Sequence, residues 1–207
     1  MYQHSLKRLL GFLLALCGLL VLWPVFLIIA IAIKIDDPGP VFFSQKRVGL
    51  HKQYFQLYKF RSMKVSTPDV PTHLLEHPEQ YISRVGGFLR KTSLDELPQL
   101  LNILKGDLSL VGPRPERPEI AAQYCEEMPE FALRLQAKAG LTGYAQVYGK
   151  YNTTPYDKLQ MDLMYIAHPS IVEDLKIMLA TIKILFMPES TEGVAEGQTT
   201  AMGQETK

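Results

Sequence analysis

The sequence predicts a mostly helical α+β protein, with an N-terminal membrane helix, a small β-hairpin and interfacial amphipathic helices around a compact domain. Three observations point to this fold class. Residues 9–33 are apolar without one charge, residues 41–63 contain two strand-like segments, and apolar side chains recur at helical spacing in residues 155–186. At 207 residues, the chain has room for one domain with attachments.

Composition narrows the classes of function. The 22 basic residues nearly cancel the 21 acidic ones, so the chain lacks the overall positive field typical of nucleic-acid binding, and no nucleic-acid partner is expected. Hydrophobic residues make up 47% of the chain, and this excess is concentrated near the N-terminus. Cys17 lies in the apolar run and Cys125 in a polar segment, so neither a disulfide nor a thiolate metal site is expected.

The apolar run reads LLGFLLALCGLLVLWPVFLIIAIAI and has three interpretations. A secretory signal peptide is disfavoured, because its apolar core is only ~7–15 residues long. A single spanning helix needs ~20 apolar residues, which this run supplies. A re-entrant helix, which enters and leaves the membrane by the same face, is the third interpretation.

Pro24 favours the re-entrant interpretation, because proline kinks or breaks a helix. At ~1.5 Å per residue, the arm before Pro24 spans roughly 22 Å and the arm after it about 14 Å. Neither arm alone crosses a hydrocarbon core of ~30 Å. Basic residues also flank both ends of the run, which leaves little charge asymmetry. Proline is tolerated in many spanning helices, so the residues alone leave both topologies open.

The next elements follow in order. Residues 37–40, DPGP, are a turn signal, and strands are expected at 41–43 and 54–63. In the second strand Lys59 and Arg61 project to the same face, because side chains alternate. We then expect a loop with at most one helical turn at 65–79, a buried helix at 97–104 ended by Lys105-Gly106, and a short strand or turn at 107–111. After these we expect one or two helices at 118–138 broken near Pro129, a loop with a short extended piece at 139–150, and a helix at 155–166.

The last expected helix, residues 170–186, is apolar around most of its circumference, with Lys176 and Lys183 marking one polar edge. It suits an in-plane helix at the lipid surface, and a buried core helix is equally compatible with the sequence. Residues 188–207 are polar and are expected to be disordered. The predicted organisation is therefore a membrane anchor at 1–35, a catalytic domain at 36–187 and a polar tail at 188–207.

The stretch KTSLDELPQL, residues 91–100, places Asp95 and Glu96 side by side. Helix capping is sufficient to explain them, because Ser93-x-x-Glu96 and Thr92-x-x-Asp95 both match the capping-box pattern. Pro98 is harmless in a first turn, so it predicts that the helix starts near Asp95.

Basic residues near this pair point to chemistry as well. Arg90 and Lys91 precede it, Arg114 lies between Pro113 and Pro115, and Arg117 follows. Such charges are costly as core ion pairs, but they suit a polyphosphate bound with a divalent cation. Mg²⁺ takes few carboxylates together with phosphate oxygens, so the pattern is compatible with a magnesium–phosphate site.

The stretches DDPGPVFFSQKRVG, YKFRSM, LRKTSLDELPQLLNILKGDLSLVGPRPE and GLTGYAQVYG resemble the bacterial sugar transferase family, the monotopic phosphoglycosyl transferases. The resemblance runs from about residue 7 to residue 186 and matches a small form without the N-terminal multi-span region. It implies a Mg²⁺-dependent enzyme that transfers a sugar-1-phosphate from a UDP-sugar to polyprenol (undecaprenyl) phosphate, giving polyprenyl-diphosphate-sugar and UMP. This would be the first membrane step of a bacterial surface glycan or exopolysaccharide pathway, on the cytosolic face of the cytoplasmic membrane.

The resemblance also implies roles for individual residues. Asp95 would be the nucleophile that forms a covalent phosphosugar intermediate, and Glu96 with Asp95 would hold Mg²⁺. The implied phosphate-binding residues are Lys59, Arg90 and Arg114; Arg61, Arg117, Pro113, Pro115 and Gln146 would support them, and Trp23-Pro24 would break a re-entrant helix.

Two departures from the family pattern bear on these roles. Many members have Ser-Pro at the helix break, whereas this chain has Trp23-Pro24. Many members also have Trp-Ala-Gln-Val-Asn-Gly-Arg in the segment that reads YAQVYGK, residues 144–150, in this chain. The expected partners are the polyprenol phosphate, the UDP-sugar, downstream glycosyltransferases and, as an option, a second copy of the chain. The competing hypothesis is a non-catalytic membrane adaptor whose two acids only cap a helix.

Overall fold

The computed structural model describes residues 5–68, 75–149 and 153–185. This part of the chain is mostly helical, with one two-stranded antiparallel sheet and one two-stranded parallel pair, which confirms the predicted α+β class. The predicted polar tail lies outside the described residues. Cys17 and Cys125 are both free, as expected.

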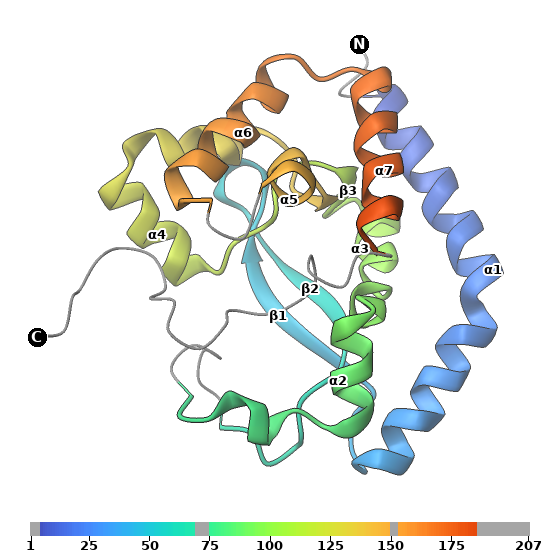
Figure 1. The fold of residues 1–207 in the computed structure, drawn as a ribbon. Helices are drawn as coiled ribbons and strands as arrows, with labels where there is room; N and C mark the ends of the chain where they lie inside the picture. The colour runs from blue at the N-terminus through green and yellow to red at the C-terminus, as the bar shows by residue number, and fades with distance from the viewer. Residues whose placement is uncertain (1–4, 69–74, 150–152, 186–207) are drawn as a thin grey trace, which may run out of the picture.

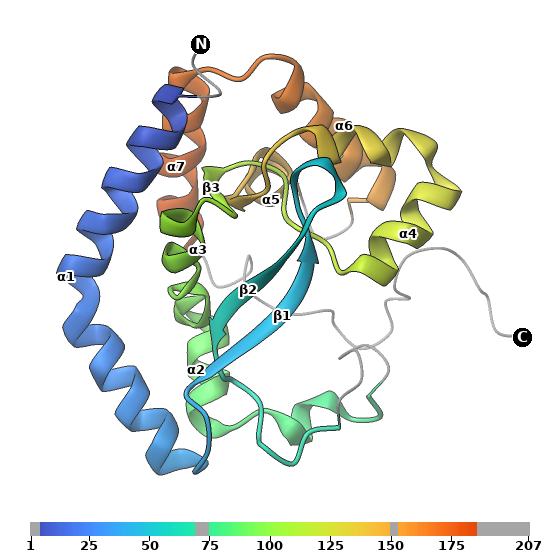
Figure 2. The same cartoon turned by 180° about the vertical axis from the view of Figure 1, so that it is seen from behind.

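The predicted hairpin is present as β1 (Phe42–Val48) and β2 (Tyr54–Phe60), which pair antiparallel and cross the middle of the molecule (Figure 2). Strand β1 is longer than predicted and β2 ends three residues earlier. The chain reverses where His51 and Lys52 adopt positive φ angles of 53° and 62°. Arg61 lies just beyond β2 and pairs with Asp37, whereas Lys59 pairs with Glu96, so the two cations predicted on one strand face have different partners.

Helix α2 (Arg84–Lys91) is capped by Ser83, whose Oγ accepts from the Gly86 N–H at 2.9 Å. Helix α3 spans Gln99–Lys105 and ends at Gly106, which has a φ of 94°, as the Lys-Gly stop signal predicted. The predicted start near Asp95 and both capping boxes were wrong. Ser93 adopts a left-handed φ of 55° and makes no side-chain cap, so Leu94–Glu96 form a separate 3₁₀ turn and α3 begins only after Pro98.

The remaining elements lie beside the hairpin (Figure 1). The break near Pro129 is confirmed, and the short helix α5 was not predicted, because a glycine-rich sequence gives no helical period. These elements are β3 (Ser109–Val111), paired parallel with β4 (Gly140–Thr142), α4 (Pro118–Glu127), a 3₁₀ stretch (Pro129–Gln136), α5 (Tyr144–Tyr148), α6 (Pro155–Ala167) and α7 (Ile171–Leu185).

Helix α1 (Lys7–Asp36) runs along one side of the molecule and is bowed (Figures 1 and 2). The helix continues through Pro24, so the predicted break is a bend rather than an interruption. A proline removes one backbone hydrogen bond, and the turns on either side can hold the helix together. Within the described residues, α1 is the one helix long and apolar enough to cross a membrane by length and composition.

The first end of α1 is fixed to the domain. The Lys7 ammonium pairs with the Asp174 carboxylate of α7 at 3.0 Å. Arg8 donates to the carbonyls of Ile103 and Leu104 at the C-terminal end of α3, the latter at 2.7 Å. These two basic residues, which as sequence only flank an apolar run, therefore act as internal ties.

The second end of α1 is fixed to the same domain. Asp36 accepts from the Val85 N–H of α2 at 2.9 Å, and Asp37 pairs with the Arg61 guanidinium at 2.6 Å. Between the ends, Ala15 and Ile33 are buried against the domain. Helix α1 therefore lies along the domain instead of leaving it.

Helix α7 lies beside α1 and α3 (Figures 1 and 2) and is not a core helix. Only Asp174 and Ile177 of α7 are buried. Its outer apolar side chains, among them Val172 at 62% and Leu179 at 59%, are exposed, and α1 beside it (Figures 1 and 2) exposes apolar side chains as well. These exposed side chains of α1 and α7 are together called the apolar surface. This arrangement favours the interfacial alternative, because large apolar surfaces of this kind mark membrane or protein contacts.

Candidate active site

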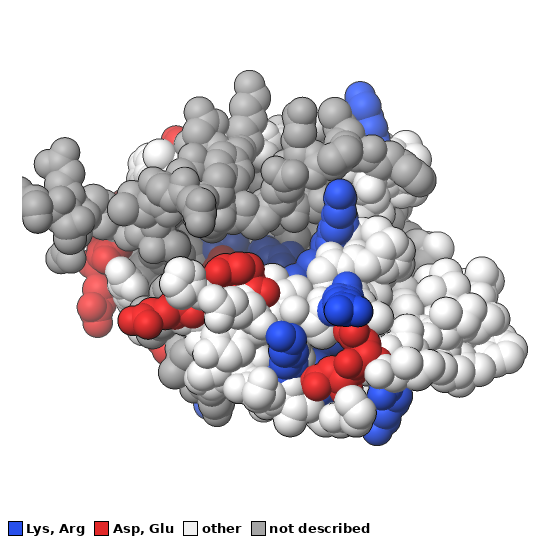
Figure 3. Space-filling view, turned by 60° about the horizontal axis from the view of Figure 1, so that its bottom comes forward, with Lys and Arg blue, Asp and Glu red and all other residues white. Residues whose placement is uncertain are grey.

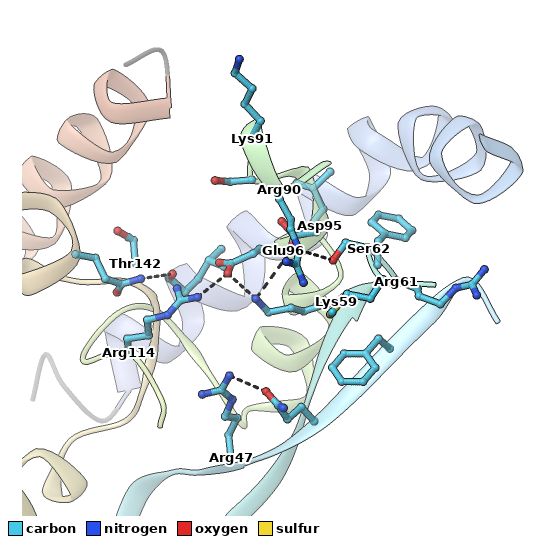
Figure 4. Close-up of a pocket in the computed structure, with 18 of the residues that line it drawn as sticks. Arg47, Lys59, Arg61, Ser62, Arg90, Lys91, Asp95, Glu96, Arg114 and Thr142 are labelled. Carbon is cyan, nitrogen blue, oxygen red and sulfur yellow. Dashed lines mark hydrogen bonds and ion pairs between the residues drawn. The ribbon is translucent and has the colours of Figure 1, made fainter. Parts of the chain in front are cut away.

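A cleft of about 1510 Å³ opens between the hairpin, the α2–α3 connection, α7 and the loop after β3. It is lined by Asp95 and Glu96 and by basic side chains that include Lys59, Arg90 and Arg114 (Figure 4). Figure 3, which brings the lower end of Figure 1 forward, shows Lys and Arg side chains close to Asp and Glu side chains on this face. The structure thus brings together five residues that are separated by up to 55 positions in sequence.

The turn that carries the two acids explains their direction. In a 3₁₀ turn, residues three apart lie on the same side. Leu94 and Leu97 therefore share one side and pack against the buried cluster that contains Phe60 and Leu89. The two residues between them face the other way, into the cleft.

Glu96 is the charge centre of the site. Its Oε1 lies 2.7 Å from the Lys59 Nζ and 2.7 Å from an Arg114 guanidinium nitrogen. Burial alone would raise the pKa of this carboxyl, but Arg114 and Lys59 outweigh it and hold the pKa well below its usual range. Glu96 is therefore ionised and locked between two cations.

Asp95 is placed differently, although it is the adjacent residue. Residue Asp95 is 8% exposed, and its Oδ2 lies 3.9 Å from the Lys59 Nζ, a longer distance than in either ion pair of Glu96. Burial raises the pKa of the Asp95 carboxyl, and the attraction of Lys59 only partly offsets it. Asp95 is thus the less tightly paired carboxylate, which leaves its oxygens better placed for a reaction.

Arg90 comes from the last turn of α2. Its Nε donates to the Ser62 Oγ at 2.9 Å, which aims the guanidinium toward the cleft beside Asp95 (Figure 4). Burial lowers the pKa of Arg90 below its usual value. Lys91, the next residue, points away from the cluster (Figure 4).

Arg114 is held through the backbone of its loop. In the segment between β3 and α4, four consecutive carbonyls each accept a hydrogen bond from another element. Gly140 N donates to Pro113 O at 2.9 Å, Arg134 Nη2 to Arg114 O at 3.1 Å, Arg47 Nη1 to Pro115 O at 3.0 Å, and Val48 N to Glu116 O at 3.0 Å.

Arg47 and Arg134 were not predicted as site residues. Arg134 is 9% exposed and ion-pairs with the buried Asp162 at 2.7 Å. Pro113 and Pro115 supply no N–H, so this loop has few donors of its own, and the donors to its carbonyls come from other elements. The sequence does show that few N–H donors lie next to Arg114. It does not show which distant residues supply the hydrogen bonds instead.

Asn102 also escaped the sequence analysis. Its side chain is completely buried, accepts from the Tyr58 N–H at 3.0 Å and donates to the Gln56 carbonyl at 2.7 Å. The amide thus extends the hydrogen bonding of β2 onto α3. This tie fixes the strand that carries Lys59 against the helix that follows the acids.

The other predicted residues take varied positions. Arg61 lines the cleft but is paired with Asp37, so it anchors the end of α1. Arg117 and Gln146 line the cleft, and Gln146 donates to the Leu141 carbonyl at 3.3 Å. Trp23 and Pro24 lie in α1, and Trp23 is 62% exposed.

The two carboxylates of Asp95 and Glu96 could bind a magnesium ion only together with further ligands, such as substrate phosphates and water. Among the described residues, no group of three His, Cys, Asp or Glu side chains could hold a metal. Mg²⁺ is commonly bound by one or two carboxylates together with substrate phosphates and water. The donor set of Asp95 and Glu96, hard oxygens surrounded by phosphate-binding cations, has that character.

The comparisons with known proteins agree with one another. The bacterial sugar transferase family profile matches residues 2–188. A UDP-glucose:undecaprenyl-phosphate glucose-1-phosphate transferase of Caulobacter vibrioides is 42% identical over 174 residues, covering 81% of this chain and 64% of the relative. The galactosyl transferase CpsE of Streptococcus agalactiae is 39% identical over 199 residues, covering 90% and 43% respectively.

A third relative is closer in length. The exopolysaccharide production protein PSS of Rhizobium leguminosarum is 39% identical over 186 residues, which cover 86% of this chain and 93% of that protein. Several other relatives are longer: the chain spans 40% of a transferase from Escherichia coli and 36% of one from Xanthomonas campestris.

Proposed function

Because this chain belongs to the bacterial sugar transferase family, we propose that it transfers a sugar-1-phosphate from a UDP-sugar to undecaprenyl phosphate, through a covalent intermediate on Asp95. The relatives named as undecaprenyl-phosphate transferases support the reaction class. The observation that carries the residue assignment is the unequal pair: Glu96 is locked by two cations, whereas Asp95 is loosely paired beside them.

The first step is attack by an Asp95 carboxylate oxygen on the sugar-linked phosphorus of the donor. An aspartyl oxygen–phosphorus bond forms, and the bond from that phosphorus to the bridging oxygen breaks. The bridging oxygen keeps the electron pair and leaves as part of UMP, so no proton needs to move. Lys59, Arg90 and Arg114 line the place where negative charge develops, and fixed cations there stabilise the transition state.

The second step transfers the sugar-phosphate from Asp95 to the lipid. A phosphate oxygen of undecaprenyl phosphate attacks the same phosphorus, and the bond to Asp95 breaks. The carboxylate of Asp95 is regenerated, and the product is undecaprenyl-diphosphate-sugar. Splitting one transfer into two displacements is the usual benefit of a covalent nucleophile.

We assign Mg²⁺ to Glu96 and Asp95, together with oxygens of the donor diphosphate. When bound, the ion supplies positive charge to the phosphate oxygens. The contribution of the chain is to hold two carboxylates at one place and to surround them with cations fixed by β2, α2 and the loop after β3.

Helix α1 supports a placement at the membrane surface. Both of its ends are tied to the same domain, and its outer side chains, such as Val21 at 74% exposure, are apolar. We propose that α1 and α7 lie in one leaflet of the cytoplasmic membrane, with the cleft at the cytosolic face. The acceptor lipid and the water-soluble donor could then both reach Asp95.

Intact-mass measurement tests the function. The detergent-solubilised protein, incubated with Mg²⁺ and each of a panel of UDP-sugars but no acceptor, should gain the mass of one sugar-phosphate and release UMP. Addition of undecaprenyl phosphate should remove the adduct. The Asp95→Asn variant should gain no mass.

Two outcomes would overturn this proposal in different ways. An adduct that persists in Asp95→Asn would place the nucleophile elsewhere. A folded wild-type protein that neither forms an adduct nor releases UMP with any UDP-sugar would support the membrane adaptor, in which the two acids have only a structural role.

A further inference from the structure

Two groups of side chains with different chemistry line the cleft that contains Asp95, and each group is called an arm. One arm is polar and lies over β1 and the start of α4, where Gln45, Arg47 and Arg117 line it. The other arm is apolar and lies between α3, β4, α5 and α7. A ligand that extends into both the cation cluster and the second arm must itself be an amphiphile.

The apolar arm is formed by side chains from several elements. Leu100 comes from α3, Leu141 from β4 and Val147 from α5, and Met178 and Ile182 come from α7. The cations Lys59 and Arg114 line the same cleft next to the acids. A phosphate bound at these cations could therefore direct an attached apolar chain along α7.

The apolar arm continues to the outer surface. Ile182 lines the cleft and is at the same time 55% exposed, and Leu185, which also lines it, is 46% exposed. Both lie on α7, which runs beside α1 (Figures 1 and 2) and, like α1, exposes large apolar side chains. The arm thus opens directly onto the face that we assign to the lipid.

We propose that this arm, between α3 and α7, binds the phosphate-proximal isoprene units of the acceptor lipid while its phosphate sits at the cation cluster. The inference rests on the proposed function. Its support is the combination of a cation cluster for one phosphate, an apolar lining in the same cleft, and the exposure of Ile182 and Leu185, which belong to that lining. The UDP-sugar carries no such chain, so it gains nothing from this arm.

Helix α7 offers a matched pair of positions for the test. Ile182 and Leu179 lie three residues apart, are 55% and 59% exposed, and both belong to the apolar surface. Only Ile182 of the two lines the cleft. The same substitution at each position therefore changes the outer surface alike and the cleft differently.

The experiment compares Ile182→Asn, Leu179→Asn and Ile182→Leu with wild type in mixed micelles. The rate of adduct formation from the UDP-sugar reports on the donor alone and should be the same in all four proteins. The apparent KM for undecaprenyl phosphate should rise roughly 10-fold or more in Ile182→Asn, the scale of losing apolar contacts in a substrate pocket. It should stay near the wild-type value in Leu179→Asn and in Ile182→Leu.

The outcomes separate this inference from the function on which it rests. A wild-type protein that forms no adduct contradicts the function itself. If adduct formation is normal and the KM for the lipid is the same in Ile182→Asn and Leu179→Asn, whether raised or unchanged, the proposed lipid-binding arm is overturned. The proposed function is then left intact. A slower adduct formation in Ile182→Asn alone would show that the arm serves the donor, and would also overturn the proposal.

Discussion

At the scale of residues, two neighbouring carboxylates acquire different properties from their surroundings. Glu96 shares one oxygen between Lys59 and Arg114, each at 2.7 Å, and its pKa is held low. Asp95 lies 3.9 Å from the Lys59 Nζ, farther than Glu96 lies from either of its partners, and burial raises the pKa of Asp95. The pair therefore divides into one group that organises charge and one that can form a bond.

The first prediction concerns Glu96. Glu96→Gln keeps the shape of the side chain but removes the charge that holds Lys59 and Arg114 in place. Adduct formation should slow by roughly 10- to 100-fold, as is typical when a partner that orients a ligand or catalytic group is lost, and more Mg²⁺ should be needed for half-maximal rate. Stopped incubations followed by intact-mass measurement over a magnesium series provide both quantities.

Glu173→Gln is the control for that change. Glu173 also pairs with a lysine, Lys176 at 3.3 Å, but this pair lies on α7 and Lys176 is 61% exposed. Exposed pairs of this kind contribute little, so its rate and magnesium dependence should match wild type. Equal effects of both substitutions would contradict the special role of Glu96.

At the scale of elements, the site depends on α2 lying against the segment that follows β2. Gly86 permits this approach, because a Cβ at that position would collide with the Ser62 carbonyl. Ser62 in turn accepts the hydrogen bond that orients Arg90. The neighbouring Gly87 has open surroundings, with the nearest atom to a Cβ 3.9 Å away.

The second prediction uses these two adjacent glycines. Gly86→Ala should destabilise the protein by about 1–3 kcal/mol through overpacking and should slow adduct formation, because α2 and Arg90 must shift. Gly87→Ala should be neutral or stabilising by up to ~1 kcal/mol, the helix propensity difference between the two residues. Denaturant unfolding in micelles and the adduct rate measure both effects.

The outcome that would count against this packing is a Gly86→Ala protein as stable and as active as Gly87→Ala. A loss of stability in both variants would point to flexibility of α2, which both glycines supply, rather than to the close approach at Ser62.

At the scale of the whole molecule, the ties at both ends of α1 constrain its topology. A straight helix of 30 residues would be ~45 Å long at ~1.5 Å per residue, enough to reach both faces of a bilayer. Yet Arg8 is bound to α3 and Asp37 to Arg61, both in the same domain. A spanning helix would have to carry that domain through the membrane, where its polar groups would be unsatisfied.

The third prediction is therefore that both ends of α1 lie on one side. Single cysteines at Ser5 and Gln53, both exposed, are introduced in a Cys17→Ala, Cys125→Ser background. In sealed inverted membrane vesicles, a membrane-impermeant maleimide should label both cysteines. In vesicles of native orientation it should label neither until detergent is added. Labelling of the two cysteines from opposite sides would establish a spanning helix and exclude the proposed placement.

Elements whose signals are local could be predicted from the amino-acid sequence. The hairpin, the stop of α3 at Gly106, the break near Pro129 and the last helix follow from alternation, left-handed glycine and proline chemistry, which act within a few residues. The acids and most of the basic residues of the cleft could likewise be named from motifs and from the resemblance to a family. These signals need no knowledge of what lies across the fold.

Features that depend on contacts between residues distant in sequence became visible only in the folded protein. The tertiary structure placed the start of α3 after Pro98, because Leu94 and Leu97 pack against the core and turn the acids outward. In the folded protein Arg61 pairs with Asp37. Arg47 and Arg134 donate hydrogen bonds to carbonyls of the loop that carries Arg114. Such partners interact because the fold brings them close together in space. The spacing of residues along the chain does not reveal which distant residues will meet.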